Sequence, residues 1–249
     1  MGDEEIKDLN ISDGGSYPLH EAVKRGDIEL VADLIKNGAD VNDRNQDGTT
    51  ALMLAARFGQ IDIVDLLIKN KANVNLKDNN GSNALIFVAF NGKLDIVKML
   101  IAAGVILNEL SRPGDFSSVF ASQRALVFAA QNGHSDIVGL LIKNGVDVNG
   151  RSKNGLTALM TAARNNHLET VKLLVESGAD VNFKSTNGTT ALINAVQGGY
   201  LEVVKFLIEK GADVNAENEY HSSALTIAHN NHYDLIEELL LKAGAKNNK

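Results

Sequence analysis

The sequence has no cysteine and no tryptophan, only two prolines, and aromatic residues make up 5% of it. Without cysteine there is no disulfide framework, which fits a cytoplasmic protein but leaves export open. The first residues are acidic and lack an apolar run, so the sequence indicates no Sec signal. No stretch approaches the roughly 18 apolar residues of a membrane span, so we expect no membrane partner.

The charge balance argues against one class of partner. The formal net charge is −7, and bulk electrostatics do not attract a polyanion such as nucleic acid to an acidic protein. The hydrophobic fraction of 44% is normal for a globular protein. Because aromatic residues are scarce, we expect a core of Leu, Ile, Val and Ala, which suits thin helix pairs that stack closely.

A unit of 33 residues is copied along the chain. Its clearest copy is GTTALMLAARFGQIDIVDLLIKNKANVN, at 48–75, which predicts a short helix at 51–58, a turn at Gly59 and a longer helix at 61–70. Equivalent alanines recur at this step, and a single step of 41, from Ala84 to Ala125, breaks it. Self-similarity at such a period indicates a stacked repeat array, in which each unit packs only against its neighbours.

The two end units depart from the pattern in a polar direction. Asp33 replaces the leucine or methionine of later units, and His229 and Glu237 replace an alanine and a valine in the last unit. An array must solvate its two terminal faces. We therefore expect these units to be caps and the array to be complete.

The turns before the first helices read YPLH at Tyr17–His20, TALM at Thr50–Met53 and TALI at Thr190–Ile193, and three units close with GADVN. This pattern resembles the ankyrin repeat from Gly15 to Asn247, in wording similar to that of bacterial members. The resemblance implies an all-α ankyrin-repeat solenoid of stacked helix-turn-helix units with hairpin-like loops. After a polar tail or cap at 1–14, seven repeats are expected near 12–44, 45–77, 78–110, 118–151, 152–184, 185–217 and 218–247.

No constellation of residues supports catalysis. The sequence has no Gly-rich phosphate loop and no nucleophile elbow. His221, His229 and His232 cluster near the end and are a conceivable metal site, but such a site needs convergent ligands and a second shell. Polar residues on a capping unit are the favoured explanation. We expect a non-enzyme with no cofactor and no metal.

The resemblance also implies where a partner binds, because ankyrin-like stacks use their hairpin tips and the exposed face of each first helix. It implies a protein-binding module that is a monomer on its own. The candidate partner-binding residues are Lys24, Arg25, Arg44, Arg57, Phe58, Lys77, Phe90, Asn91, Arg112, Phe116, Phe120, Gln131, Asn132, Arg151, Lys153, Arg164, Asn165, Lys184 and Tyr220.

The charge on this face is predicted to differ from that of the whole chain. Its positions carry nine bases and four acids, the acids being Asp13, Asp47, Glu217 and Glu219. A basic face on an acidic body would steer an acidic segment of a partner into place, so an acidic polypeptide is favoured over nucleic acid. The alternative is that these are merely solvated turn residues.

Exposed aromatics and one insertion extend this hypothesis. Phe58 and Phe90 are expected to face solvent as interface anchors, or else to pack on the hairpin stems. The insert, at about 109–123, has apolar content and is predicted to be a finger that contacts the partner, although it can equally fold onto Ile106 and Leu107. The roles considered are inhibitor, immunity protein, adaptor and effector, with a structural spacer array as the alternative.

Overall fold

The computed structural model describes residues 17–107, 121–152 and 154–246. Its helices fall into two units, which end and begin at Ile106 and Leu107. Unit 1 contains α2 (Pro18–Arg25), α3 (Ile28–Lys36), α4 (Ala51–Phe58), α5 (Ile61–Lys69), α6 (Ala84–Asn91) and α7 (Leu94–Ala102). Unit 2 contains α8 (Ala121–Gln131), α9 (Ser135–Lys143), α10 (Ala158–Arg164), α11 (Leu168–Glu176), α12 (Ala191–Gln197), α13 (Leu201–Glu209), α14 (Ala224–Asn230) and α15 (Asp234–Lys242). No helix among the described residues is long and apolar enough to cross a bilayer.

Local signals explain where the first helices begin and end. The side chain of Thr50 caps α4 by accepting the backbone N–H of Met53 at 3.3 Å. Asn83, Thr157, Thr190 and Ser223 cap the later first helices in the same way. The first repeat uses Pro18 at its first helical position instead, and Gly26 ends that helix with a left-handed φ of 71°.

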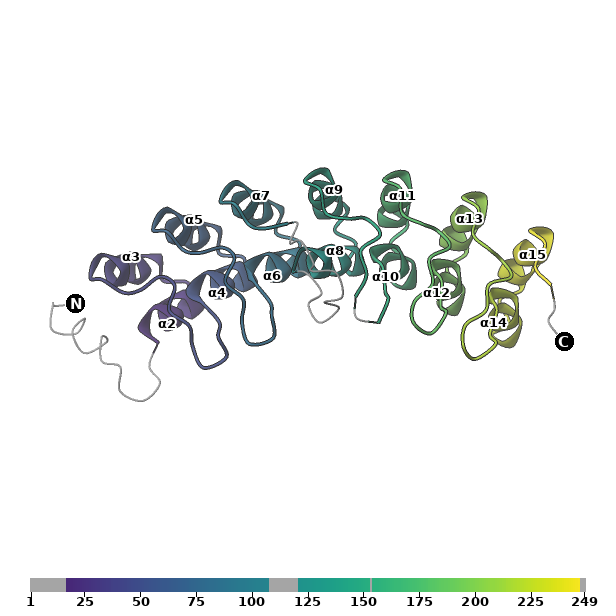
Figure 1. Cartoon of the computed structure of the whole chain (residues 1–249), viewed down its shortest axis with the longest axis horizontal. Helices are drawn as coiled ribbons and strands as arrows, with labels where there is room; N and C mark the ends of the chain where they lie inside the picture. The colour runs from purple at the N-terminus through teal and green to yellow at the C-terminus, as the bar shows by residue number, and fades with distance from the viewer. Residues whose placement is uncertain (1–16, 108–120, 153, 247–249) are drawn as a thin grey trace, which may run out of the picture. The chain divides into compact units, whose positions relative to one another are not determined.

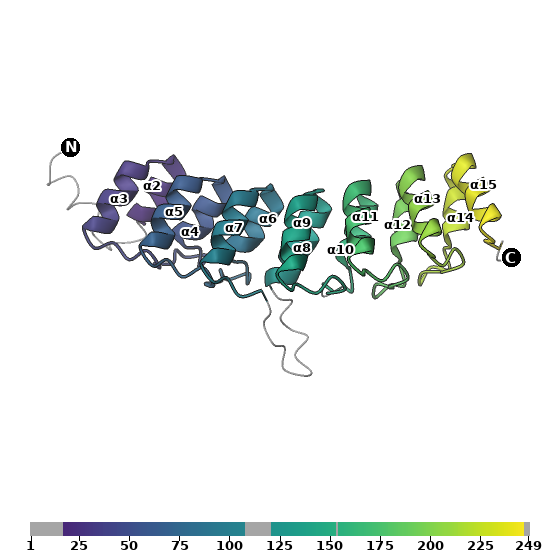
Figure 2. The ribbon, with the colours of Figure 1, turned by 90° about the horizontal axis from the view of Figure 1, so that it is seen from above.

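Within each unit, first helices pack on first helices and second helices on second helices, which gives two layers (Figure 1; Figure 2). The connecting hairpins project together from the first-helix layer (Figure 1). A leucine on each second helix points between the layers and is at most 2% exposed. These leucines are Leu34, Leu67, Leu100, Leu141, Leu174, Leu207 and Leu240. The small alanines of the first helices let neighbouring repeats approach closely, so the core is continuous within a unit.

Asparagines that follow the second helices join neighbouring repeats. Nδ2 of Asn182 donates to the carbonyl of Gly211 at 3.0 Å, and its Oδ1 accepts the N–H of Asp213 at 2.7 Å. The same two-way link is made by Asn42, Asn75, Asn149 and Asn215. Because each asparagine satisfies a donor and an acceptor of the next repeat, the links set the spacing between repeats.

The expected helices at 51–58 and 61–70 correspond to α4 and α5, and α5 ends one residue earlier. Residues 121–123, which the sequence assigned to the finger, form the start of α8, and the remainder of the finger lies outside the described residues. The tail at 1–14 also lies outside them. Asp33 is exposed, and Nδ1 of His229 lies 3.1 Å from Glu237, so both end units present polar groups, as predicted.

Candidate partner-binding surface

The first helix of each repeat and the hairpin before it carry the residues predicted to bind a partner. Those that are exposed are Lys24, Arg25, Arg44, Arg57, Phe58, Phe90, Arg151, Arg164, Asn165, Lys184 and Tyr220. Those that are half-buried are Lys77, Asn91, Gln131 and Asn132. Arg112, Phe116, Phe120 and Lys153 lie outside the described residues. The structure thus puts most of the described candidates in contact with solvent.

Some of these side chains hold the fold together. Arg44 donates from Nη2 to the carbonyl of Lys77 at 2.9 Å, which links its own hairpin to the next one. Nδ2 of Asn91 donates to the carbonyl of Arg57 on the preceding first helix at 2.5 Å. The amides of two further candidates, Asn132 and Asn165, donate to carbonyls of their own helices. The hydrogen bonds within the chain are therefore enough to explain why these four positions carry polar side chains, without a binding partner.

The basic residues of the two layers differ in their surroundings. Each second helix carries one lysine, and five of the seven pair with a carboxylate one turn away. Lys36 and Lys143 are the exceptions. On the first helices and hairpins, Arg25, Arg164 and Lys184 are exposed and make no hydrogen bond or ion pair with any residue that the structure describes. These three charges are therefore available to a partner.

Two arginines of the surface lie over phenylalanine rings. The guanidinium carbon of Arg57 is 5.9 Å from the ring centroid of Phe87, and that of Arg151 is 5.0 Å from the centroid of Phe183. A guanidinium that stacks on a ring keeps its in-plane N–H donors free for a carboxylate or another acceptor. The stacking also restricts the side chain, which lowers the entropy lost on binding.

Phe58 and Phe90 are exposed aromatics, as the sequence predicted, with 51% and 48% of their surface accessible. They lie in the last turns of α4 and α6, on consecutive first helices of unit 1. Large side chains that are half in solvent and half supported by a helix are the kind that anchor interfaces. Unit 1 therefore offers apolar area as well as charge.

An open pocket of about 240 Å³ lies on the same part of unit 1. It is lined by α4, α6 and the hairpins that precede them. The lining residues on the helices are Met53, Leu54, Arg57 and Phe87, and those on the hairpins are Asp47, Thr49, Asp78, Asn80 and Ser82. The pocket has an apolar side that is largely buried and a polar side that includes both signs of charge.

Comparison with known proteins identifies the architecture. A family model described as "Ankyrin repeats (3 copies)" matches residues 19–111, 106–185 and 178–249. The chain belongs to the ankyrin repeat family. A crystal structure of the human ASB11 ankyrin repeat domain superposes with a TM-score of 0.75 at 25% sequence identity, covering 93% of this chain and all of that domain. Ankyrin repeats are generally protein–protein interaction modules rather than enzymes.

A second similarity is short. The E3 ubiquitin-protein ligase XBAT33 of Arabidopsis thaliana is 55% identical over 42 residues, which is 17% of this chain and 8% of the ligase. The chain thus spans only a small part of the length of that relative, and the similarity amounts to little more than one ankyrin repeat.

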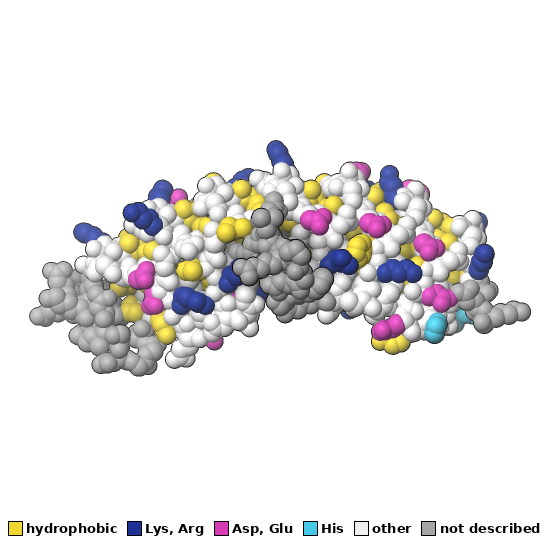
Figure 3. Space-filling model, in the orientation of Figure 1, with side chains coloured by type: hydrophobic (Ala, Val, Ile, Leu, Met, Phe, Trp, Pro, Cys, Tyr) yellow, Lys and Arg dark blue, Asp and Glu magenta, His cyan; other side chains and the backbone are white. Residues whose placement is uncertain are grey.

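Two first helices of unit 2, α10 and α12, present a more polar face than α4 and α6 of unit 1. Thr161 and Asn194 occupy the positions that hold Leu54 and Phe87 in unit 1, whereas α8 and α14 carry the apolar Phe128 and Ile227 there. Oγ1 of Thr161 donates to the carbonyl of Ala158 at 2.9 Å, within its own helix. Over α10 to α15, basic and acidic side chains are interspersed on the face drawn in Figure 3. Polar groups, rather than aromatic ones, therefore dominate this part of the array.

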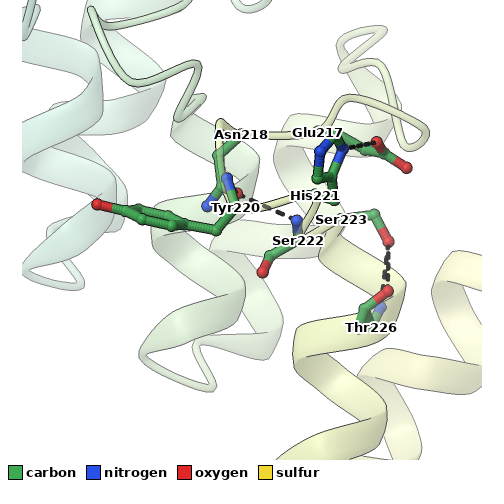
Figure 4. Close-up of polar contacts among 7 residues, drawn as sticks. All are labelled: Glu217, Asn218, Tyr220, His221, Ser222, Ser223 and Thr226. Atoms are coloured by element: carbon green, nitrogen blue, oxygen red, sulfur yellow. Dashed lines mark hydrogen bonds and ion pairs between the residues drawn. The ribbon is translucent and has the colours of Figure 1, made fainter.

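The hairpin of the last repeat exposes an aromatic residue of its own. Oδ1 of Asn218 accepts the backbone N–H groups of Tyr220 and Ser222 at 3.0 and 3.1 Å, which closes the turn (Figure 4). Tyr220 is 71% exposed, and its ring extends away from the turn (Figure 4). The turn is therefore fixed by Asn218, while the phenol remains accessible.

The histidines near the end of the chain contact separate carboxylates. Nδ1 of His221 lies 3.7 Å from Glu217 (Figure 4), and Nδ1 of His229 lies 3.1 Å from Glu237. Among the described residues, no three His, Cys, Asp or Glu side chains come together as metal ligands would. The polar contacts fit their position on the last repeat.

Sequence reasoning missed residues that contribute to the surface. Leu54 and Phe87 were absent from the candidate residues, and Glu21 and Asp78 were left out of the charge count. Glu21 pairs with Lys24 at 2.6 Å, and this contact with the Lys24 ammonium lowers the pKa of its carboxyl. Among the described residues, unit 1 has five bases and three acids on this face once both acids are included, which reduces its positive excess. Glu21, Leu54 and Phe87 occupy the same position of the repeat, which a column-by-column alignment of the repeats would show.

Proposed function

We propose that this chain is a non-catalytic module that binds a protein partner, through an acidic segment, on the first helices and hairpins of its ankyrin repeats. The observation that carries the proposal is the contrast between the two layers. Five of the seven lysines of the second helices are paired with carboxylates of their own helix. On the first helices and hairpins Lys24 is paired with Glu21, whereas Arg25, Arg164 and Lys184 have no such partner among the described residues. Unpaired charges on a rigid surface attract a partner of opposite sign and raise its association rate.

The chemistry of the surface favours a polypeptide over other ligands. Bases are spread along the repeats among amides, hydroxyls and aromatic side chains, a mixture that suits peptide recognition. The overall charge of −7 disfavours a long polyanion. We include inhibitor, immunity protein, adaptor and effector among the roles of such a module, and the absence of cysteine favours the cytoplasm as its place of action.

The plant ligase lends no activity to this proposal, because its similarity is confined to 42 residues. The second candidate function is a structural spacer that binds nothing tightly. It is favoured by the side chains that bind the chain itself, above all Arg44 and Asn91, which link neighbouring repeats.

The test is a charge reversal with a matched control. One variant carries Arg25→Glu, Arg164→Glu and Lys184→Glu, and the control carries Lys36→Glu, Lys143→Glu and Lys246→Glu, which change the net charge equally. Each is used to capture proteins from a lysate of the organism that encodes the chain, at physiological salt, with quantitative mass spectrometry. We expect a protein that the wild type and the control retain and the first variant loses. A protein that all three chains capture equally would contradict binding through these three charges, and capture of nothing above empty beads favours the spacer.

A further inference from the structure

The pocket of unit 1 has the dimensions of one side chain. Its volume of about 240 Å³ falls below the roughly 300–1,000 Å³ of sites that enclose a drug-sized ligand or cofactor. It is also open to solvent along the first helices, where a partner would lie. A pocket of this kind on a binding surface receives a single anchor residue, and such anchors contribute most of the affinity of an interface.

The apolar side of the pocket favours an inserted residue whose side chain is largely apolar. Met53 and Leu54 are 1% and 7% exposed, and Phe87 from the next repeat completes the wall. Methionine adapts its shape to an inserted group, and its sulfur contacts aromatic rings favourably. The ring of Phe87 already carries the guanidinium of Arg57, so a flat group that enters here meets both an aromatic face and a cation.

The polar side of the pocket determines which polar group the end of the inserted side chain can carry. Neither the Arg57 guanidinium nor the Asp47 carboxylate makes a hydrogen bond or ion pair with a residue that the structure describes. Asp78 differs, because its Oδ1 accepts the backbone N–H groups of Asn80 and Ser82 at 2.9 and 2.7 Å. Among its charged side chains the pocket therefore offers an unused donor group on Arg57 and an unused acceptor group on Asp47.

The charged residues that line the pocket further restrict which side chain of the partner can bind in it. A cationic tip would meet Arg57, and an anionic tip would meet Asp47 and Asp78. A neutral tip that donates and accepts meets no like charge and satisfies both unused groups. Among the natural side chains, tyrosine combines an apolar ring with a hydroxyl that both donates and accepts, whereas the indole of tryptophan only donates and serine or threonine leaves the pocket unfilled.

We propose that the pocket lined by Met53, Leu54, Arg57 and Phe87 receives a tyrosine side chain of the protein partner. The ring lies against Phe87 and Leu54, and the hydroxyl donates to Asp47 and accepts from Arg57. This proposal rests on the proposed function, since the tyrosine belongs to the partner's segment. It adds a specificity that charge alone does not supply, because an acidic segment without the tyrosine leaves the pocket empty.

Methionine methyl NMR tests the pocket without the partner. The chain has four methionines, and Met160 of α10 occupies the position in unit 2 that Met53 of α4 occupies in unit 1. Methyl-¹³C-methionine is incorporated into the full chain, and p-cresol is titrated as the analogue of a tyrosine side chain. Toluene, propylguanidinium and propionate stand for phenylalanine, arginine and glutamate. Met160 is the internal control.

We expect p-cresol to shift the Met53 methyl signal saturably, with an affinity in the millimolar range that suits a fragment of this size, while Met160 does not move. Toluene should bind more weakly, because it lacks the hydroxyl. The variant Phe87→Asn, which installs the residue that Asn194 provides in unit 2, should abolish the shift. If that variant fails to fold, Leu54→Thr, which copies Thr161, serves in its place and should weaken p-cresol about 10-fold.

Three results would overturn the proposal: a Met53 signal that answers propylguanidinium or propionate at lower concentration than p-cresol, equal responses of Met53 and Met160, or no response to p-cresol. These outcomes are separate from the capture experiment, which reverses Arg25, Arg164 and Lys184 and leaves the pocket intact. Absence of p-cresol binding together with a partner that only the charge-reversed variant loses would remove the tyrosine assignment alone. A p-cresol response together with a partner that all three chains capture equally would remove the acidic segment.

Discussion

The two units of this array share one backbone plan and differ in what their first helices present. At one position of the repeat, α4 and α6 of unit 1 have Leu54 and Phe87, and α10 and α12 of unit 2 have Thr161 and Asn194, although α8 and α14 carry apolar residues there. The polar residues are not free for a partner, because Thr161 donates within its own helix and Asn194 donates to the carbonyl of Met160 at 3.3 Å. The repeats of α10 and α12 thus satisfy their polar groups internally at this position, while those of α4 and α6 leave apolar area open.

This difference shows how a repeat protein separates stability from recognition. The buried leucines and the asparagine links recur in both units, so the energy that stacks the repeats does not depend on the variable positions. Those positions are consequently free to vary, and they lie on the proposed partner-binding surface. In an array that is stabilised through nearest neighbours, one repeat can change its face without cost to distant ones.

The largest loss of stability is expected when a buried leucine of the core is truncated. Because both units share this core, the loss should be the same in each. Leu67→Ala in unit 1 and Leu207→Ala in unit 2 each remove a side chain that is 0% exposed. Truncating a buried leucine costs about 2–5 kcal/mol in transfer energy and cavity formation. Urea unfolding of the two variants should give losses that agree within about 1 kcal/mol. A much smaller loss in one unit would show that the cores are not equivalent.

The links between repeats should follow with a smaller effect. Asn182→Ala removes a donor to Gly211 and an acceptor for Asp213, and each hydrogen bond contributes about 1 kcal/mol net. We expect a loss of about 1–2 kcal/mol, measured as a thermal midpoint lower by several degrees. Asn144→Ala is the control, since its amide donates only to Leu140 of its own repeat. Equal losses for both variants would mean that the asparagine acts through its own turn and not between repeats.

The surface residues can also be exchanged between the units. Met160 and Arg164 of α10 match Met53 and Arg57 of α4, so this part of unit 2 keeps the methionine and the arginine of the site and lacks its apolar wall. Thr161→Leu with Asn194→Phe supplies that wall. We expect p-cresol to shift the Met160 signal in this variant and to leave it unmoved in the wild type, a gain in affinity of at least about 10-fold, or ~1.4 kcal/mol.

The exchange has its own control. Asn154 and Ser185 stand in unit 2 where unit 1 has Asp47 and Asp78. The preference for p-cresol over toluene should therefore be smaller at Met160 in the variant than at Met53 in the wild type. A variant that keeps its thermal midpoint and still leaves Met160 unmoved would show that residues outside this set form the pocket.

The helices were predictable from the sequence because their determinants are local. The apolar spacing, the cap at Thr50 and the left-handed Gly59 all lie within one repeat, and the expected 51–58 helix is α4. The pocket was not predictable in this way, because Leu54 and Phe87 come from different repeats and each looks like a core residue by itself. The structural role of Arg44 was not predictable for a similar reason, because its hydrogen bond to Lys77 connects one hairpin to the next.

The smallest effect we expect is a pH dependence of stability that arises in the first repeat of unit 1. This repeat has His20 at the position where the other repeats have Met53, Met160 or another residue that does not titrate. His20 is 2% exposed, its Nε2 donates to the carbonyl of Thr49 at 2.8 Å, and its Nδ1 is buried without a partner among the described residues. Burial lowers the pKa of His20 below its ordinary value of 6.5, so the unfolded chain binds a proton more readily than the folded one.

The stability that neutral His20 contributes should therefore be complete above about pH 6.5 and decrease as the pH falls through the lowered pKa of the folded protein. His20→Met copies Met53, removes the titrating group and also removes the bond to Thr49. The urea midpoint of the wild type should fall between pH 7.5 and pH 5 by more than that of the variant. If the urea midpoints of the wild type and the variant fall equally with pH, the folded protein tolerates protonated His20. That would require a hydrated Nδ1, and hence a looser contact between the first two repeats than the buried ring indicates.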